Sequence, residues 1–216
     1  MADEAPLPDI LPIFPLTGVL LLPRGLLPLN IFEPRYLAMF RDAMKGERLI
    51  GMVQPSHPPV REMNPAVYPL GCAGRITSFS ETEDGRFLVA LTGVSRFQIT
   101  EELPLLSGYR RVVPAWDDFA DDLIPDAAGF DRPRLAQGLR AFFDQRQVQA
   151  DWDAIDRAPG EHLVTSIAMM CPFAPNEKQA LLEAKTLAER ARLLTALIEM
   201  SVGVPSPDPA AGVTRH

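Results

Sequence analysis

The chain has 216 residues, of which 47% are hydrophobic and 23% are charged, and its formal net charge is −7. This composition is ordinary for a folded globular protein and excludes disorder over most of the length. The acidic balance argues against broad electrostatic attraction to nucleic acid or to anionic lipid.

The sequence indicates neither an export signal nor a membrane span. The amino terminus, "MADEAP", is acidic where a secretory signal is basic. Four prolines and Arg24 interrupt the apolar segment 10–32, whereas a spanning helix needs roughly 20 continuous apolar residues. Cys72 and Cys171 are too few for a disulfide framework. We therefore expect a reduced, cytoplasmic protein.

The first half has the punctuation of short strands with one helix among them. Brief apolar runs bounded by proline or glycine predict strands at "LPIFPL", "VLLLP", "LPLNIF" and "RLIGMV". A helix begins at Pro34, since proline suits a first helical turn, and ends near Gly46. Its apolar stripe consists of Tyr36, Phe40, Ala43 and Met44.

Further strands follow, and together they predict a barrel or half-barrel. Residues 72–81 and 86–93 flank Asp84-Gly85, a dipeptide that suits a tight hairpin turn, and more strands are expected at 96–100 and 109–115. Within "GCAGR", the two glycines indicate a bulge or a close backbone contact rather than a phosphate-binding loop.

The second half is predicted to be a helical bundle. The acidic segment Trp116–Asp131 shows no period and is interpreted as a solvated linker. Pro133 then suits the first turn of a helix, Pro172 stops another, and Asn176 is a candidate cap for a third. Thr186 and Glu189 have capping-box spacing before the last helix. The apolar faces of these helices contain Leu135, Leu139 and Phe142; Leu163, Ile167 and Met170; and Leu187, Ala191, Leu194 and Ile198.

These patterns predict three parts: a β-rich subdomain at 1–118, a helical subdomain at 119–203, and a disordered tail at 204–216 that is rich in proline and small residues. No catalytic, cofactor or metal site is expected. The sequence contains no phosphate-binding P-loop, and "GVSRF" has Phe97 where a nucleophile elbow needs glycine. The three histidines are far apart in sequence, and the aspartates of the linker are interpreted as solvated.

Four runs carry a resemblance to a known family: "LPIFPLTGVLLLPRGLLPLNIFEPRYLAMFRDAMKGERLIGMV", "YPLGCAGRITSFSETEDGRFLVALTGVSRFQITEEL", "YRRV" and "PNEKQALLEAKTLAERARLLTALIEM". They are similar to the amino-terminal, substrate-recognition domain of the ATP-dependent protease Lon. The resemblance covers nearly the whole chain. It implies an α+β fold, with a PUA-like β pseudobarrel that has one embedded helix, followed by a helical bundle. The ATPase and protease modules of Lon have no counterpart in this sequence, so we expect a stand-alone relative.

The resemblance implies a non-catalytic module that recognises unfolded or exposed hydrophobic polypeptide segments, or that acts as an adaptor for a proteolytic complex. Self-association is left open. RNA binding is the alternative, because PUA-like barrels occur in RNA-associated proteins, although the acidic charge argues against it.

Candidate peptide-binding residues follow from this interpretation. Short proline-broken strands leave leucines near the surface, and a core role for each leucine is the competing interpretation. The corner Glu33-Pro34-Arg35-Tyr36 either fixes the strand-to-helix turn or lines a groove. The full candidate set is Leu16, Val19, Leu21, Leu26, Leu29, Glu33, Arg35, Arg75 and Arg96.

Overall fold

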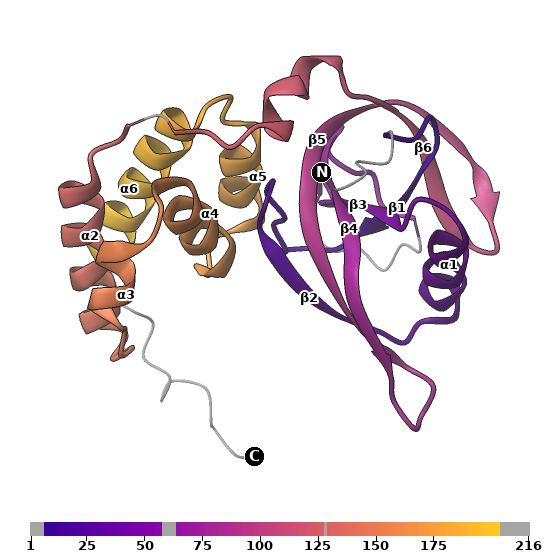
Figure 1. The fold of residues 1–216 in the computed structure, drawn as a ribbon, viewed down its shortest axis with the longest axis horizontal. Helices are drawn as coiled ribbons and strands as arrows, with labels where there is room; N and C mark the ends of the chain where they lie inside the picture. Colours follow the sequence, from indigo (N-terminus) through magenta and orange to yellow (C-terminus); the bar gives the residue numbers. More distant parts are fainter. Residues whose placement is uncertain (1–6, 58–63, 128, 204–216) are drawn as a thin grey trace, which may run out of the picture.

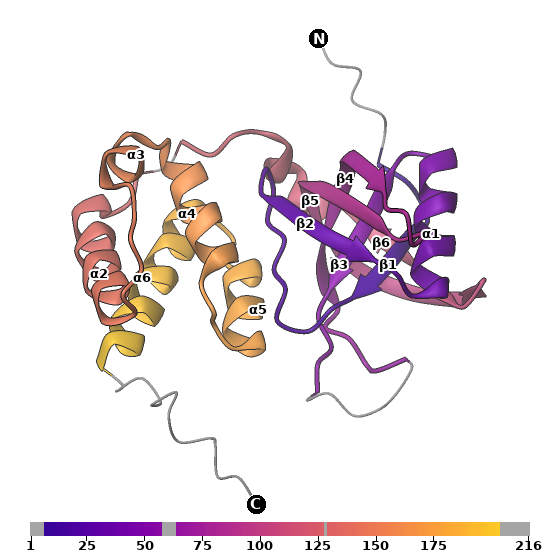
Figure 2. The ribbon, with the colours of Figure 1, turned by 90° about the horizontal axis from the view of Figure 1, so that it is seen from below.

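A β-rich half and a helical half lie side by side in the computed structural model, which describes residues 7–57, 64–127 and 129–203 (Figure 1). The predicted tail at 204–216 lies outside these residues. Figure 2 shows the two halves from below, with α5 nearest the sheet and α2 and α3 farthest from it.

The β-rich half contains six strands and one α-helix. In chain order they are β1 (Leu11–Pro15), β2 (Leu26–Ile31), α1 (Pro34–Lys45), β3 (Leu49–Val53), β4 (Leu70–Glu81), β5 (Phe87–Leu106) and β6 (Tyr109–Ala115). A short 3₁₀ segment, η1 (Asp117–Leu123), leads to the helical half. That half consists of α2 (Arg132–Gln145), α3 (Trp152–Arg157), α4 (Gly160–Met170), α5 (Pro175–Glu183) and α6 (Leu187–Gly203).

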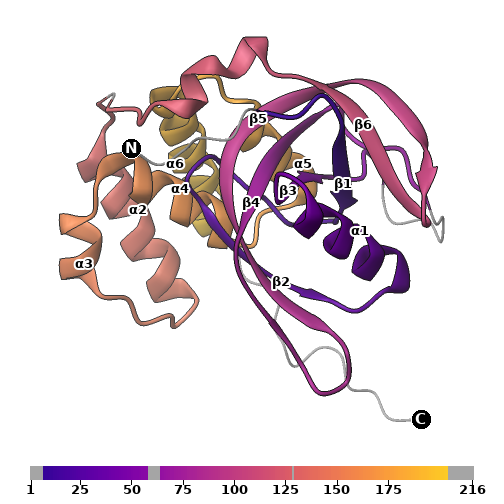
Figure 3. The same cartoon turned by 45° about the vertical axis from the view of Figure 1, so that its right-hand side comes forward.

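The sheet closes on itself because β5 is long enough to take part in it twice. The first half of β5 pairs with β2 and β4, and its second half pairs with β6. The strand order β2-β5-β4-β3-β1-β6 therefore returns to β5, and the result is a pseudobarrel (Figure 3). Only the β1–β3 pair is parallel among the described strands. The predicted α+β class and PUA-like pseudobarrel are confirmed.

The embedded helix has the predicted bounds. Pro34 occupies its first turn, and the helix ends at Lys45, directly before Gly46. Tyr36 and Phe40 are buried, with their ring centroids 4.1 Å from Phe14 and 4.5 Å from Phe87. The helix thus packs its apolar stripe onto the barrel, against β1, β3 and β6.

Glycines make room inside the barrel. The ring of Phe97 is fully buried, and a Cβ added to Gly51 or Gly71 would lie within 2.8 Å of it. The register also shifts between Ala73 and Gly74. Both interpretations of "GCAGR", a bulge and a close backbone contact, are confirmed. Gly93 is tighter still, since a Cβ there would lie 2.0 Å from the carbonyl oxygen of Leu22.

Several predicted elements differ in the structure. The run "VLLLP" forms no strand, although its three leucines are buried, and the strands expected at 86–93 and 96–100 are one continuous β5. Asn176 lies inside α5 rather than at its cap. The amide of Ala174, before that helix, donates instead to the carboxylate of Glu177 at 2.7 Å. Met170, which the spacing places on an apolar face, is 70% exposed.

The apolar faces of the other helices are buried as predicted, with Leu135, Leu139, Phe142, Leu163, Ile167, Leu187, Ala191, Leu194 and Ile198 in the core. The largest hydrophobic cluster contains residues of both halves. The sequence pattern does not predict the helix α3, because it is six residues long and buries none of its side chains fully. The subdomain boundary near residue 118 stays a prediction.

We expect Gly93→Ala to lower the free energy of unfolding by at least about 2 kcal/mol, because the new methyl group meets backbone atoms that cannot rotate away. Urea denaturation measures this loss. Gly129→Ala is the control, since a Cβ added there would have no atom within 4 Å, and it should change stability by less than about 0.5 kcal/mol. Equal stability of the two variants would contradict the close contact at Gly93.

Candidate functional site

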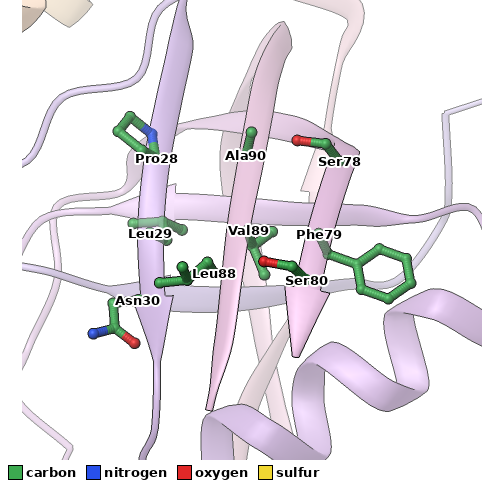
Figure 4. Close-up of a pocket in the computed structure, with 9 residues that line it drawn as sticks. All are labelled: Pro28, Leu29, Asn30, Ser78, Phe79, Ser80, Leu88, Val89 and Ala90. Carbon is green, nitrogen blue, oxygen red and sulfur yellow. The ribbon is translucent and has the colours of Figure 1, made fainter. Parts of the chain in front are cut away.

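An apolar hollow lies on the outward side of strands β2, β5 and β4 (Figure 4). Its volume is about 640 Å³. We call this surface the outer face and define it by the residues Leu26, Pro28, Asn30, Ser78, Ser80, Leu88 and Ala90. The register sets Pro28 and Ser78 opposite Ala90, and Asn30 and Ser80 opposite Leu88, so these side chains share one side of the sheet.

The outer face combines exposed apolar side chains with small polar ones. Leu26 is 64% exposed and Leu88 is 47% exposed. None of the nine residues that line the hollow is charged. An extended apolar segment could therefore bury leucine side chains here while the hydroxyl and amide groups of Ser78, Ser80 and Asn30 bond its backbone.

The strand β2 forms the border of the outer face. Among the described strands it pairs only with β5, so its other edge is open. Pro28 sits in the middle of β2 and has no backbone N–H to offer a further strand. This arrangement disfavours strand addition and leaves contact with side chains as the main mode of binding.

The five candidate leucines and valines lie in different environments. Leu21 and Leu29 are buried, and Leu16 and Val19 are half-buried against the core, which is the competing role that the sequence left open. Only Leu26 is widely exposed on the outer face. Sequence reasoning misses the other outer-face residues, because the continuous apolar run "RFLVAL" shows no alternation that would tell Leu88 from Val89.

The charged candidates do not gather at one place. Arg35 pairs with Glu33 at 2.9 Å and lies over the ring of Tyr36, so both charges stabilise the corner before α1. Arg75 is half-buried on β4, and one of its N–H groups donates to the carbonyl oxygen of Glu47. Arg96 is buried in the junction between the two halves.

Arg96 holds three parts of the chain together. Its Nε and Nη2 atoms donate to the carboxylate of Asp122 at 2.9 and 2.8 Å. Its remaining donors reach the carbonyl oxygens of Leu182, in the last turn of α5, and of Ala184 and Lys185, between α5 and α6. The prediction of a solvated linker is wrong for Asp122, because this aspartate is buried and accepts from Arg96.

Two more arginines, Arg24 and Arg190, lie close to the pair of Arg96 and Asp122. Arg24 has a left-handed backbone, with φ of 61°, and its guanidinium contacts Glu161 and the carbonyl oxygen of Asp122. Arg190 donates to the carbonyl oxygen of Leu181. Burial, together with the nearby charge of Arg96, lowers the pKa of Arg190 to about 10. These guanidinium groups already bond acceptors within the protein, so the junction is a structural connection.

The two cysteines are free and buried. Burial raises the pKa of Cys171 to about 11, and it raises the pKa of Cys72 further. Both thiols are therefore protonated at neutral pH and are poor nucleophiles. Within the described residues, no group of three or more His, Cys, Asp or Glu side chains could hold a metal ion. No helix in the same residues is long and apolar enough to span a bilayer.

Comparison with known proteins gives a family match over most of the chain. The family model described as the substrate-binding domain of ATP-dependent protease La (Lon) matches residues 10–200. Among curated proteins, Lon protease 2 of Myxococcus xanthus is 24% identical over 201 residues, and Lon protease of Anaeromyxobacter dehalogenans is 23% identical over 201 residues. These alignments cover 92% of this chain and 24% of each relative, so the chain spans about a quarter of their length.

Solved structures give the same fold. A Lon N-terminal domain protein from Xanthomonas campestris matches with a TM-score of 0.59 and 22% identity, over 87% of this chain and 97% of that chain. The N-terminal domain of Lon protease from the Mycobacterium avium complex matches with a TM-score of 0.62 and 18% identity, over 88% of this chain and 97% of that chain.

Asp122→Ala should cost about 3–5 kcal/mol of stability, because it leaves the buried guanidinium of Arg96 without its carboxylate. Chemical denaturation measures the loss. Asp118→Ala, an exposed neighbour in η1, is the matched control and should change stability by less than about 0.5 kcal/mol. A small effect at Asp122 would show that the junction does not depend on this pair.

Neither thiol should react with a chromogenic disulfide reagent in the native protein at pH 8, because both are buried and protonated. Both should react at once in concentrated urea. Absorbance of the released thiolate measures the two rates. Fast labelling without denaturant would contradict the buried positions.

Proposed function

This chain belongs to the family of substrate-binding domains of the ATP-dependent protease Lon, and from that membership we propose that it is a non-catalytic protein-binding module. It recognises unfolded or exposed hydrophobic polypeptide segments, and its binding surface is the outer face. The observation that carries the proposal is an uncharged hollow lined by the exposed Leu88, with the exposed Leu26 in the next row along β2, on a fold of this family.

Physical chemistry supports this choice of surface. Clustered exposed apolar side chains on a soluble domain mark interaction sites, since each leaves water when a partner binds. Leu26 and Leu88 lie on neighbouring strands, with Ala90 and Pro28 between them along the register. A segment laid across β2 and β5 covers these side chains at once.

Two versions of the proposal differ in the partner. In the first, the chain captures unfolded segments by itself; in the second, it is an adaptor that brings them to a Lon-type protease. The free, buried cysteines support a reducing, cytoplasmic location in both versions. Co-elution of the chain with a full-length Lon protease, with and without an unfolded client, separates the two.

Leu26→Asp combined with Leu88→Asp should weaken binding of a permanently unfolded, carboxymethylated protein at least about tenfold, because each aspartate would have to lose water on docking. Fluorescence anisotropy of the labelled client measures the affinity. Leu105→Asp is the control: Leu105 is 49% exposed on β5 but lies outside the outer face, in the part of β5 beyond its pairing with β2, so this change should leave binding unaltered.

Circular dichroism and thermal unfolding must be unchanged in all variants, since exposed side chains carry little of the folding energy. Equal affinities of the double variant and the wild type would overturn the proposed surface. Loss of binding in Leu105→Asp alone would move the surface to the β5–β6 hairpin.

A further inference from the structure

The cationic side chain of Arg75 lies at one end of the outer face. The register sets Leu26 opposite Thr92 on β5, and Thr92 opposite Arg75 on β4. Directly paired residues project to the same side of a sheet, so Arg75 belongs to the outward side, beside the hollow. The next rows along the strands are Pro28, Ala90 and Ser78, and then Asn30, Leu88 and Ser80.

Arg75 carries a charge that the described residues do not neutralise. One N–H of its guanidinium donates to the carbonyl oxygen of Glu47 at 3.0 Å, and no carboxylate in the described part of the chain forms an ion pair with it. A guanidinium presents five donors in a planar fork that matches a carboxylate. Most of this fork remains available to a ligand.

The opposite end of the outer face differs. Arg86 lies there, over the ring of Phe32, but it pairs with Asp84 at 2.7 Å. The hollow between the two ends is lined by uncharged residues only. The two ends of the outer face therefore differ in charge. At the Leu26 end lies a cation that no described carboxylate pairs with, the middle is uncharged, and the arginine at the Phe32 end is paired with Asp84.

We propose that the outer face selects extended segments in which an apolar stretch is followed by a carboxylate, and that Arg75 binds this carboxylate. The inference rests on the proposed function, since it names the kind of segment that the same surface takes. The carboxylate is an aspartate or glutamate side chain or the free end of a chain, because both present the same two oxygens to the fork.

The spacing follows from strand geometry. Four residues of strand separate Leu26 from Asn30, which lies opposite Leu88. At about 3.3 Å per residue this distance is roughly 13 Å. A ligand residue packed on Leu88 would thus be about four residues from the one that meets Arg75.

The test uses four peptides that share one apolar stretch of five residues. In three of them the stretch is followed by Asp, Asn or Lys and the peptide end is amidated. The fourth ends directly after the stretch in a free carboxylate. On the full wild-type chain, the Asp and free-end peptides should bind about three to five times more tightly than the Asn peptide, the range expected of a partly exposed ion pair. The Lys peptide should bind most weakly. Raising the salt concentration should shrink these differences.

Arg75→Gln should abolish the preference for the Asp and free-end peptides and leave the affinity for the Asn peptide unchanged. Arg75→Lys should keep part of this preference. Arg86→Gln, which removes a cation that is already paired, should keep the whole preference. Unchanged thermal unfolding confirms that each variant is folded. Retention of the preference in Arg75→Gln, or its loss in Arg86→Gln, would overturn the inference.

The outcomes separate this inference from the proposed function. Tight, equal binding of all four peptides to the wild type overturns the role of Arg75 and leaves the protein-binding function standing. Failure of all four peptides to bind overturns both. A preference of the free-end peptide over the Asp peptide identifies a chain terminus as the source of the carboxylate.

Discussion

The buried pair of Arg96 and Asp122 determines how the two halves of this protein meet. Arg96 stands on β5, the strand that closes the barrel, and Asp122 stands on the 3₁₀ segment that leaves it. The same guanidinium donates to carbonyl oxygens at the end of α5 and between α5 and α6. Because a charge buried without its partner is so costly, the barrel, the connecting segment and the helices have to keep this arrangement together.

Other buried polar groups join the halves in the same way. Lys178 on α5 donates to the carbonyl oxygen of Gly18, and the side chain of Gln54 donates to that of Pro175. The helices are thereby held at the segment between β1 and β2, at the end of β3 and at η1, while the outer face of β2, β5 and β4 keeps its exposed leucines. A surface that is both rigidly supported and left uncovered suits binding of a partner better than packing within the chain.

The sequence predicts features that depend on a residue's own backbone or near neighbours. It does not predict contacts between residues that are far apart in the chain. Pro34 and Gly46 define the helix α1 correctly, because both act through their own backbone. Asp122 resembles its exposed neighbours in sequence, and only the fold brings Arg96 to it from 26 residues away. The prediction of which leucines are exposed fails for a related reason. Residues that alternate between core and surface have similar side chains when both sides of a strand are apolar. Leu26 is therefore the one outer-face residue that the sequence identifies.

Proline and glycine give the barrel its functional asymmetry. Gly93 lets β5 approach the Leu22 carbonyl directly beside the point where its pairing with β2 begins, and the paired β2 and β5 carry most of the outer face. At the open edge of β2, Pro28 has no backbone N–H, so a further strand would find no donor at the middle of this edge. The edge is thus protected against pairing with another sheet, while the side chains next to it stay exposed. If the outer face binds apolar segments as we propose, it does so by side-chain contacts, and no continuous ladder of backbone hydrogen bonds has to form or break.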